Sequence, residues 1–326
     1  MICTLFSRTS VAQYRDTTKS MRQIAQELGV AYVLEGSVRR AGNKVRVTGQ
    51  LIRASSDEHV WAKSYDRDLT DIFAIQSQLA TEIADSLQAA ISPKEKSLIE
   101  NRPTDNLAAY DLYLKGRAVL KGMRTDLNRD QAEEALQEAV KLDPNFAAAW
   151  GTLALAHATA VFGDEDRSPE RLAKAKAAID TAVRLAPDDP EVIEAFGDYY
   201  YYGYRDYSRA AEQYQRLLVV RPNSAEAYAQ LGFLLRRQGH WAEALANVRH
   251  ALELDPRNIH FLSGFTDMLS GLRCYDEALV QAPSHGGRGE WRSAPASDAI
   301  PNPLPRPWPG QWHGRGDGQP EIGAAG

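Results

Sequence analysis

Five basic side chains gather on one short stretch of the chain, "YVLEGSVRRAGNKVRVTGQLIRA" at residues 32–54: Arg39, Arg40, Lys44, Arg46 and Arg53. Basic residues at this density could bind phosphate groups or nucleic acid. However, no aromatic side chains alternate with the arginines to stack on bases, and the formal net charge of the chain is −5. We therefore interpret the stretch as the solvated surface of a sheet and expect no nucleic-acid partner.

Residues that could catalyse a reaction or hold a metal ion are scattered. The seven histidines and the two cysteines, Cys3 and Cys274, show no spacing typical of metal ligands. The motifs G-x-x-x-x-G-K-[ST], G-x-G-x-x-G and H-E-x-x-H are absent. We therefore predict no catalytic residue, no metal site and no cofactor, and we expect the chain not to be an enzyme.

The location of the protein follows only loosely from its composition. Two distant cysteines fit a reducing compartment. No run of about 18 apolar residues is present, so we predict no membrane span. These features favour the cytoplasm and leave open the periplasmic side of a membrane-anchored protein.

The first 100 residues are expected to contain both strands and helices. Over residues 1–100 the patterns predict a strand at 2–6, a helix that ends at Gly29, a hairpin, a third strand at 60–65 and a helix closed by Ser92 and Pro93. In the hairpin, Val45, Val47 and Leu51 alternate with polar residues, and Gly42 and Asn43 can take the positive φ of a turn. We predict an incomplete small α/β domain.

An internal repeat occupies residues 106–281. Its most visible marks are prolines in "KLDPN", "RLAPD", "VRPN" and "ELDPRN", which recur at intervals of 43, 35 and 34 residues. Large, small and apolar residues repeat with them, as in Tyr228, Leu231 and Gly232 of one unit and Ile193, Phe196 and Gly197 of the unit before. This pattern resembles the tetratricopeptide (TPR) family, in which helix pairs of about 34 residues stack into a solenoid. We expect about four units and a partial fifth.

The first region carries a second resemblance. The stretch "GVAYVLEGSVRRAGNKVRVTGQLIRA" and the later "HVWAKSYDRDLTDIFAIQSQLATEIADSL" are similar to the TolB N-terminal-like domain of bacterial signalling proteins. That domain commonly lies between an effector and a TPR array. The resemblance implies that the effector is a class III adenylate cyclase, a serine/threonine kinase or a winged-helix regulator. The opening strand ending in Pro-Phe is missing here, so we expect a truncated domain.

The TPR resemblance also implies a binding surface, because the first helices of stacked units line a concave groove. Counted from the large residue of each first helix, the groove positions are Glu194, Asp198 and Tyr201 in the third unit. In the fourth unit they are Phe233, Arg236 and Arg237. Two neighbouring arginines could hold a carboxylate or phosphate. The alternative is that these are ordinary solvated helix positions, and the pattern does not decide between the two.

The final residues, 282–326, hold 8 prolines and 9 glycines among 45 residues, with three branched aliphatic side chains. Such a composition cannot bury enough apolar surface to fold, so we predict a disordered tail. The abrupt loss of the repeat after Gln281 suggests out-of-frame sequence.

The fold class we expect is thus an α+β N-terminal fragment, an all-α TPR solenoid and a disordered tail. The predicted function is a non-catalytic module of a bacterial signalling protein that binds a protein or peptide partner in its groove. The alternative is the regulatory part of a cyclase or kinase whose catalytic domain lies outside this chain.

Overall fold

The computed structural model describes residues 11, 14, 17–89, 91–121, 126–163 and 166–274. The predicted strand at residues 2–6 and the tail at 282–326 lie outside these residues. The end of the partial fifth repeat unit, residues 275–281, lies outside them as well.

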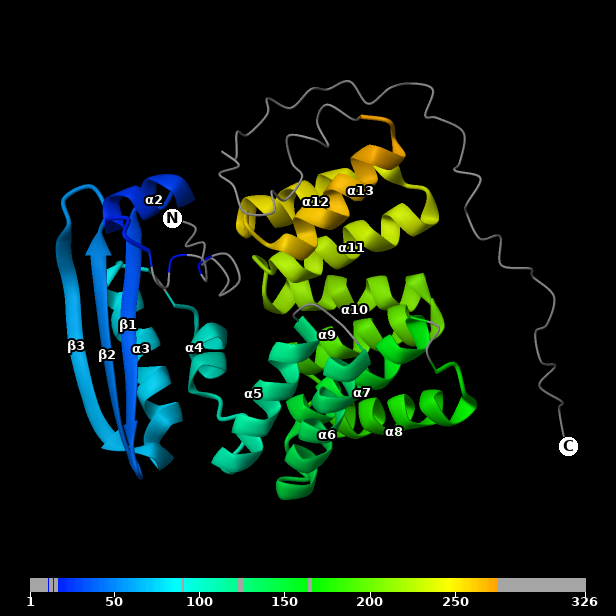
Figure 1. Cartoon of the computed structure of the whole chain (residues 1–326), viewed down its shortest axis with the longest axis horizontal. Coiled ribbons are helices and arrows are strands. Elements are labelled where there is room, and N and C mark those ends of the chain that lie inside the picture. The colour runs from blue at the N-terminus through cyan, green and yellow to red at the C-terminus, as the bar shows by residue number, and fades with distance from the viewer. Residues whose placement is uncertain are drawn as a thin grey trace, which may run out of the picture. The chain divides into compact units, whose positions relative to one another are not determined.

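A three-stranded antiparallel sheet forms first, in the order β1 (Tyr32–Ala41), β2 (Lys44–Arg53) and β3 (Glu58–Asp68) (Figure 1). Ala41 lies opposite Lys44, so Gly42 and Asn43 make the turn as predicted. Only Gly42 has a positive φ, at 58°, which corrects the expectation for Asn43. One left-handed residue is enough to reverse the chain, and glycine takes that conformation without a Cβ clash.

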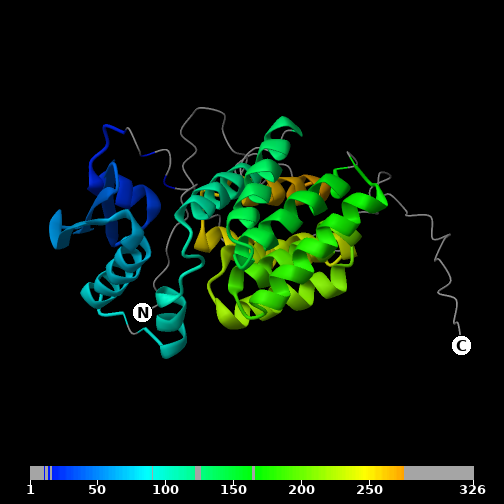
Figure 2. The same cartoon turned by 90° about the horizontal axis from the view of Figure 1, so that it is seen from below.

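Helix α3 (Ile72–Ser86) covers one face of the sheet (Figures 1 and 2). The alternation in β2 buries Val45 against Tyr65 of β3 and Ile75 of α3, and Val47, Trp61 and Leu79 pack around them. Period-two burial on the strands and a helical stripe on α3 thus meet in one small core.

The helix expected to continue to Ser92 and Pro93 ends earlier. Its last residue is Ser86, and Gln88 has a positive φ of 54°. Ser92 instead begins helix α4 (Pro93–Glu100), since its side chain caps the helix in a capping box with Glu95. The Ser92-Pro93 pair therefore begins a helix here, because proline is accommodated in the first helical turn as well as after the end of a helix. Before the sheet, helix α2 (Met21–Leu28) ends at Gly29, with φ 67°, as predicted.

Helix pairs follow, in chain order. They are α5 (Leu107–Lys121) with α6 (Asp126–Leu142), α7 (Ala147–Phe162) with α8 (Pro169–Leu185), α9 (Pro190–Asp198) and η3 (Tyr199–Tyr204) with α10 (Tyr207–Val220), and α11 (Ala225–Gln238) with α12 (Trp241–Leu254). The two helices of each pair lie side by side (Figure 1). The repeated prolines Pro144, Pro187, Pro222 and Pro256 stand in the turns after each pair. They mark the pairs because proline cannot continue the preceding helix.

Glycine allows the two helices of a pair to approach closely. A Cβ atom on Gly232 of α11 would lie 2.5 Å from Val248 Cγ2 and 2.9 Å from the carbonyl oxygen of Ala244, both on α12. The repeat therefore has a small residue at this position because α11 and α12 are in close contact there.

A second compact unit begins at Ile259 and contains helix α13 (Ile259–Gly271). Its apolar residues Phe261, Phe265, Met268 and Leu269 are buried and recur at helical spacing. In the described part of the chain, no helix is long and apolar enough to cross a membrane.

Candidate binding groove

Side chains from the first helices of three successive pairs converge on a small cavity, which we call the groove cavity. Its volume is about 30 Å³, and it is lined by Tyr113, Arg117 and Leu120 of α5, Thr152 and Leu155 of α7, and Glu191, Glu194, Ala195 and Asp198 of α9. A space of this size holds a single water molecule. The groove cavity marks the face of the repeat on which α5, α7 and α9 bring polar side chains together.

Glu191 is the polar centre of this face. Its carboxylate accepts a hydrogen bond of 2.5 Å from the Tyr113 hydroxyl and forms an ion pair of 3.2 Å with Arg117. Burial, and then the charge of Glu191, raise the pKa of Tyr113, so the phenol keeps its proton. These contacts join α9 to α5, two units apart in the repeat, and hold the side chains of the face in place.

The predicted groove residues of the third unit differ in burial and in their contacts. Glu194 is half-buried and lines the groove cavity. Asp198 also lines it, but only 5% of the residue is exposed, and its carboxylate accepts a hydrogen bond of 2.7 Å from Tyr214. Tyr201 is buried, and its ring centroid lies 5.7 Å from that of Phe162. Glu194 is therefore the most accessible of the three.

The predicted groove residues of the fourth unit lie on α11 and differ in solvent exposure. Phe233 is buried, Arg236 is half-buried and Arg237 is exposed. The guanidinium of Arg236 lies 5.8 Å from the Phe233 ring centroid, and that of Arg237 lies 5.8 Å from the Phe162 ring centroid. Both distances are those of cation–π contacts. The arginines are not brought into the groove cavity, and their role in binding stays a prediction.

Sequence reasoning missed Tyr113, Arg117 and Glu191. The signal was present, because Tyr113 and Arg117 stand around Gly116, the small residue of the first unit, as Glu194 and Asp198 stand around Gly197. Applying the same count to every unit would have found the two α5 residues.

The run of tyrosines after α9 forms the π-helical turn η3. Arg205 ends it with a positive φ of 55°, and the amide of Asp206 donates to the carbonyl oxygen of Tyr200. Single π-helical turns are frequent at functional sites. Here the turn buries Tyr201 and Tyr202 against Phe162 of α7, so it shapes the core behind the groove.

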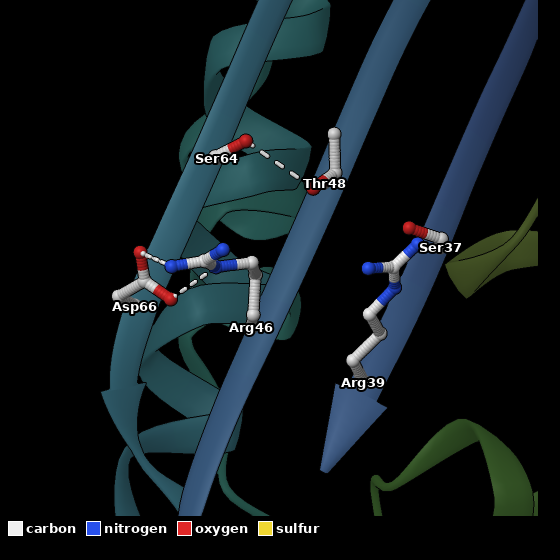
Figure 3. Close-up of a pocket in the computed structure, with 6 residues that line it drawn as sticks. All are labelled: Ser37, Arg39, Arg46, Thr48, Ser64 and Asp66. Atoms are coloured by element: carbon white, nitrogen blue, oxygen red, sulfur yellow. Dashed lines mark hydrogen bonds and ion pairs between the residues drawn. The ribbon is translucent and has the colours of Figure 1, made fainter. Parts of the chain in front are cut away.

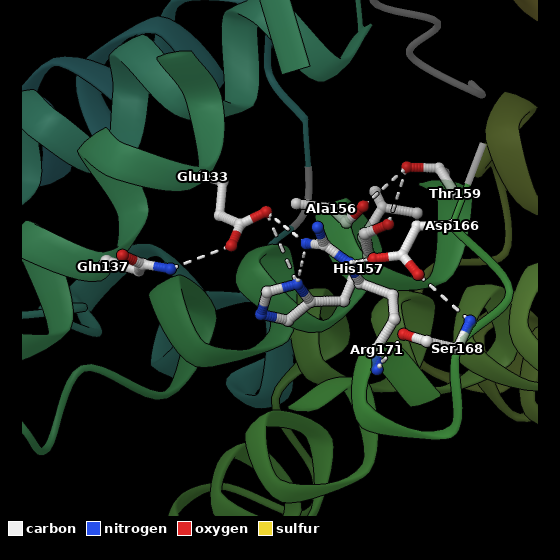
Figure 4. A network of polar contacts seen from close by, with 9 residues as sticks. Glu133, Gln137, Ala156, His157, Thr159, Asp166, Ser168 and Arg171 are labelled. Carbon is white, nitrogen blue, oxygen red and sulfur yellow. Dashed lines mark hydrogen bonds and ion pairs between the residues drawn. The ribbon is translucent and has the colours of Figure 1, made fainter. Parts of the chain in front are cut away.

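A buried polar network lies between the first two helix pairs (Figure 4). Nη1 of Arg171 on α8 lies 2.5 Å from Glu133 on α6 and 3.0 Å from Nδ1 of His157 on α7. Nε of the same arginine donates to Asp166 at 2.8 Å. Burial lowers the pKa of His157 to about 4, so the imidazole is neutral and accepts the arginine proton. The network therefore joins three helices, α6, α7 and α8.

The basic residues of the hairpin are largely paired across the sheet (Figure 3). Arg46 donates two hydrogen bonds, of 2.6 and 3.0 Å, to Asp66, and Thr48 is bonded to Ser64 at 3.2 Å. Lys44 pairs with Asp68 at 2.8 Å, and Arg53 with Glu58 at 2.5 Å. Acidic residues of β3 thus balance three of the five positive charges that stood out in the sequence. This pairing supports the interpretation of the hairpin as a solvated sheet surface.

Within the described residues, no group of three or more His, Cys, Asp or Glu side chains is arranged to hold a metal ion.

The stack of helix–turn–helix pairs defines a class of protein, the helical repeat scaffold, whose first helices offer a surface to other proteins. Comparison with known families agrees with this class: residues 225–258, which include α11 and α12, match the family model described as tetratricopeptide repeat. This segment is a TPR, and the pairs before it have the same construction. The predicted TPR architecture is therefore confirmed, whereas the resemblance of the first region to the TolB N-terminal-like domain stays a prediction.

Among known proteins, a relative from Rhizobium meliloti (strain 1021), named "Putative adenylate cyclase 3", is 34% identical over 182 residues. The match covers 54% of this chain and 31% of that protein, so the chain spans about a third of its relative's length. Among solved structures, the thermophilic TPR protein TTC0263 of Thermus thermophilus is 22% identical, with a TM-score of 0.42. The alignment covers 61% of this chain and 99% of that one. PilF of Pseudomonas aeruginosa is 21% identical, with a TM-score of 0.40 and coverages of 54% and 73%.

Proposed function

We propose that this chain is a non-catalytic interaction module of a bacterial signalling protein, and that it binds an extended peptide segment of a protein partner along its first helices. The observation that carries the proposal is the convergence of α5, α7 and α9 on one face with Tyr113, Arg117 and Glu194. A binding face needs polar groups held in place before the partner arrives, because ordering them on binding would weaken affinity. The contacts of Glu191 with α5 supply that order.

The chemistry of the face favours a peptide of mixed character. Glu194 offers a carboxylate to a basic residue, while Arg237 on α11 offers a guanidinium to an acidic one. Leu155 of α7, which lines the groove cavity with Glu194, gives an apolar contact. A partner that presents both charged and apolar side chains along an extended backbone would match these groups.

A second candidate function is regulation of a nucleotide cyclase. The observation in its favour is the relative named as an adenylate cyclase, which shares about half of this chain. On this hypothesis the repeats control a catalytic domain of another part of the protein. The two candidates differ in the occupant of the groove, which is an unrelated partner in the first and a cyclase segment in the second.

The test is selection of peptides from a phage-displayed random library on the full-length chain, followed by fluorescence anisotropy with the selected peptides. We expect Glu194→Lys and Arg237→Glu each to weaken binding about tenfold, which corresponds to about 1.4 kcal/mol. Matched controls are Glu212→Lys on α10 and Arg184→Glu on α8, both on the second helices of their pairs. We expect the controls to bind like the unchanged chain.

Two results would contradict the proposal. The first is selection of peptides whose affinity is unchanged in both groove variants, because binding would then occur elsewhere. The second is formation of cyclic AMP from ATP by the purified chain, which would make it an enzyme. The cyclase hypothesis gains support instead if a peptide from the Rhizobium meliloti relative binds and loses affinity in Glu194→Lys.

A further inference from the structure

Strand β1 forms one edge of the sheet. Among the described residues it pairs with β2 alone, and no described strand lies along its other side. The edge carries two large apolar side chains in solvent: Leu34 is 49% exposed and Val38 is 67% exposed. Exposed, apolar strand edges are sites where another strand can add to a sheet.

The hydrogen bonds of the sheet show which backbone groups of β1 are available. The amide of Ala54 donates to the carbonyl oxygen of Ala31 at 3.0 Å, and these residues continue the β1–β2 register. In an antiparallel ladder, hydrogen-bonded pairs alternate with non-hydrogen-bonded pairs. Odd-numbered residues of β1 therefore bond to β2, and Leu34, Gly36 and Val38 direct their N–H and C=O groups to the free edge.

We propose that β1 pairs with β1 of a second copy of this chain, antiparallel, about a two-fold axis at Gly36. Leu34 then lies opposite Val38 of the second copy, and Val38 lies opposite its Leu34. All the groups that face the free edge near the axis find partners, and the four exposed apolar side chains come together. The two sheets become one continuous six-stranded sheet.

The charges on the other face of β1 agree with the same axis. Glu35 and Arg39 have no ionic partner in the described part of the chain, and four residues of strand place them about 13 Å apart, too far to pair with each other. In the proposed dimer, Glu35 lies diagonally across from Arg39 of the second copy, at about 7–8 Å between backbone positions. Long side chains bridge that distance. Two ion pairs would therefore form across the axis.

Other arrangements match less well. With the axis moved to Ser37, Leu34 would lie opposite Arg40 and Gly36 opposite Val38, so the apolar side chains would separate. The opposite edge of the sheet, β3, carries charged residues along most of its length, including Lys63, Asp66 and Arg67. Charged side chains on an edge strand discourage pairing. Pairing at β1 about Gly36 is the arrangement that these side chains favour.

Cysteine cross-linking tests the register directly. In a full-length chain with Cys3→Ser and Cys274→Ser, the double variant L34C/V38C should form disulfide-linked dimers under mild oxidation. Opposed residues of a hydrogen-bonded pair have Cα atoms about 5.5 Å apart, which suits a disulfide. The single variants L34C and V38C should remain uncross-linked, because each new thiol is about 13 Å from its symmetry mate.

A matched control is L34C/R40C, which would cross-link well only with the axis at Ser37. Equal cross-linking of L34C/R40C and L34C/V38C, or no cross-linking of either, would overturn the proposal. Sedimentation velocity of the unchanged chain should show a dimer in equilibrium with monomer. A monomer at every concentration would also overturn it, and the edge would then be left for a different strand.

A charge exchange provides a test that does not depend on cysteine. We expect E35R and R39E each to raise the dimer dissociation constant about tenfold, because each brings like charges together across the axis. The double variant E35R/R39E restores opposite charges and should return to within about threefold of the unchanged chain. Loss of the dimer in the double variant to the same degree as in the single variants would contradict the proposed axis.

Discussion

The hydroxyl of Tyr214 donates a hydrogen bond of 2.7 Å to a carboxylate oxygen of Asp198, which joins α10 to the inner face of α9. Both residues are buried, and burial raises the pKa of Tyr214 well above its usual value. The second helix of a unit thus holds in place a carboxylate that the first helix presents to the groove cavity.

Replacing Tyr214 with phenylalanine removes this bond and leaves the Asp198 carboxylate with one donor fewer in a buried site. We expect Tyr214→Phe to lower the free energy of unfolding by about 1–3 kcal/mol. Urea denaturation followed by circular dichroism measures it. The control is Tyr207→Phe, since Tyr207 is half-buried, its ring contacts Tyr201, and its hydroxyl makes no hydrogen bond to a described residue. An equal loss in both variants would show that the hydrogen bond is not the cause.

Acid should weaken the network between the first two helix pairs. Burial lowers the pKa of His157 to about 4, below the ordinary value of about 6.5 that it regains on unfolding. The unfolded chain therefore binds a proton that the folded chain does not, and stability falls as the pH drops through this window. We expect His157 to account for about 1–2 kcal/mol of stability lost between about pH 7 and pH 5.

The measurement is urea denaturation at both pH values for the unchanged chain and for His157→Asn. The asparagine oxygen can still accept the hydrogen bond from Arg171 but does not titrate. The variant should lose less stability on acidification. The same loss in both proteins would mean that another group governs the acid response.

Helix α3 is fastened to the sheet by one carboxylate. Glu82 accepts hydrogen bonds from Lys63 at 2.7 Å, Gln78 at 2.9 Å and Tyr65 at 3.1 Å. Hydrogen bonds from Lys63 first, and from its other neighbours, lower the pKa of Glu82 to about 2. The stabilisation is complete above the ordinary glutamate pKa and is lost as the pH falls towards about 2.

We expect Glu82→Gln to destabilise the protein by about 1–2 kcal/mol at pH 7, a modest figure because the side chain is 22% exposed. Tryptophan fluorescence during urea denaturation measures this change. Asp85→Asn, an exposed position on the same helix, is the control and should change stability by less than about 0.5 kcal/mol. A Glu82→Gln variant as stable as the control would show that the hydrogen bonds of Glu82 do not stabilise the contact between α3 and the sheet.

The crossing of α11 and α12 should not tolerate a methyl group. Gly232→Ala places a Cβ 2.5 Å from Val248 and 2.9 Å from a backbone oxygen, so the helices must separate. We expect a loss of about 2 kcal/mol. Gly203→Ala is the control, because its Cβ would meet nothing closer than 3.8 Å. Thermal unfolding should separate the two variants, and equal melting temperatures would contradict the close crossing.

Local patterns predicted the elements well where the physical cause is local. Alternation along β2 and the glycine after Leu28 act within a few residues, and the structure has the strand and the helix end at those places. The end of α3 was misjudged because a serine–proline pair has two local uses. Only the left-handed Gln88 shows that the helix has already ended before Ser92 begins the next one.

The sequence could predict which repeat positions belong to the candidate site. It could not predict the burial of those side chains or the contacts between them. Glu194 and Asp198 stand at groove positions by count, yet one is half-buried and the other is tied to Tyr214. The bond from Tyr113 to Glu191 joins residues 78 positions apart, and no local pattern indicates such a contact.

The residues by themselves determined that this chain is a sheet-containing segment followed by stacked helix pairs, because periodic burial and proline spacing act over one turn, one strand or one repeat unit. Only the tertiary structure decided which polar side chains are accessible and, among the described residues, which strands form the edges of the sheet. The reason is that burial, ion pairing and pKa depend on neighbours brought together from distant parts of the chain.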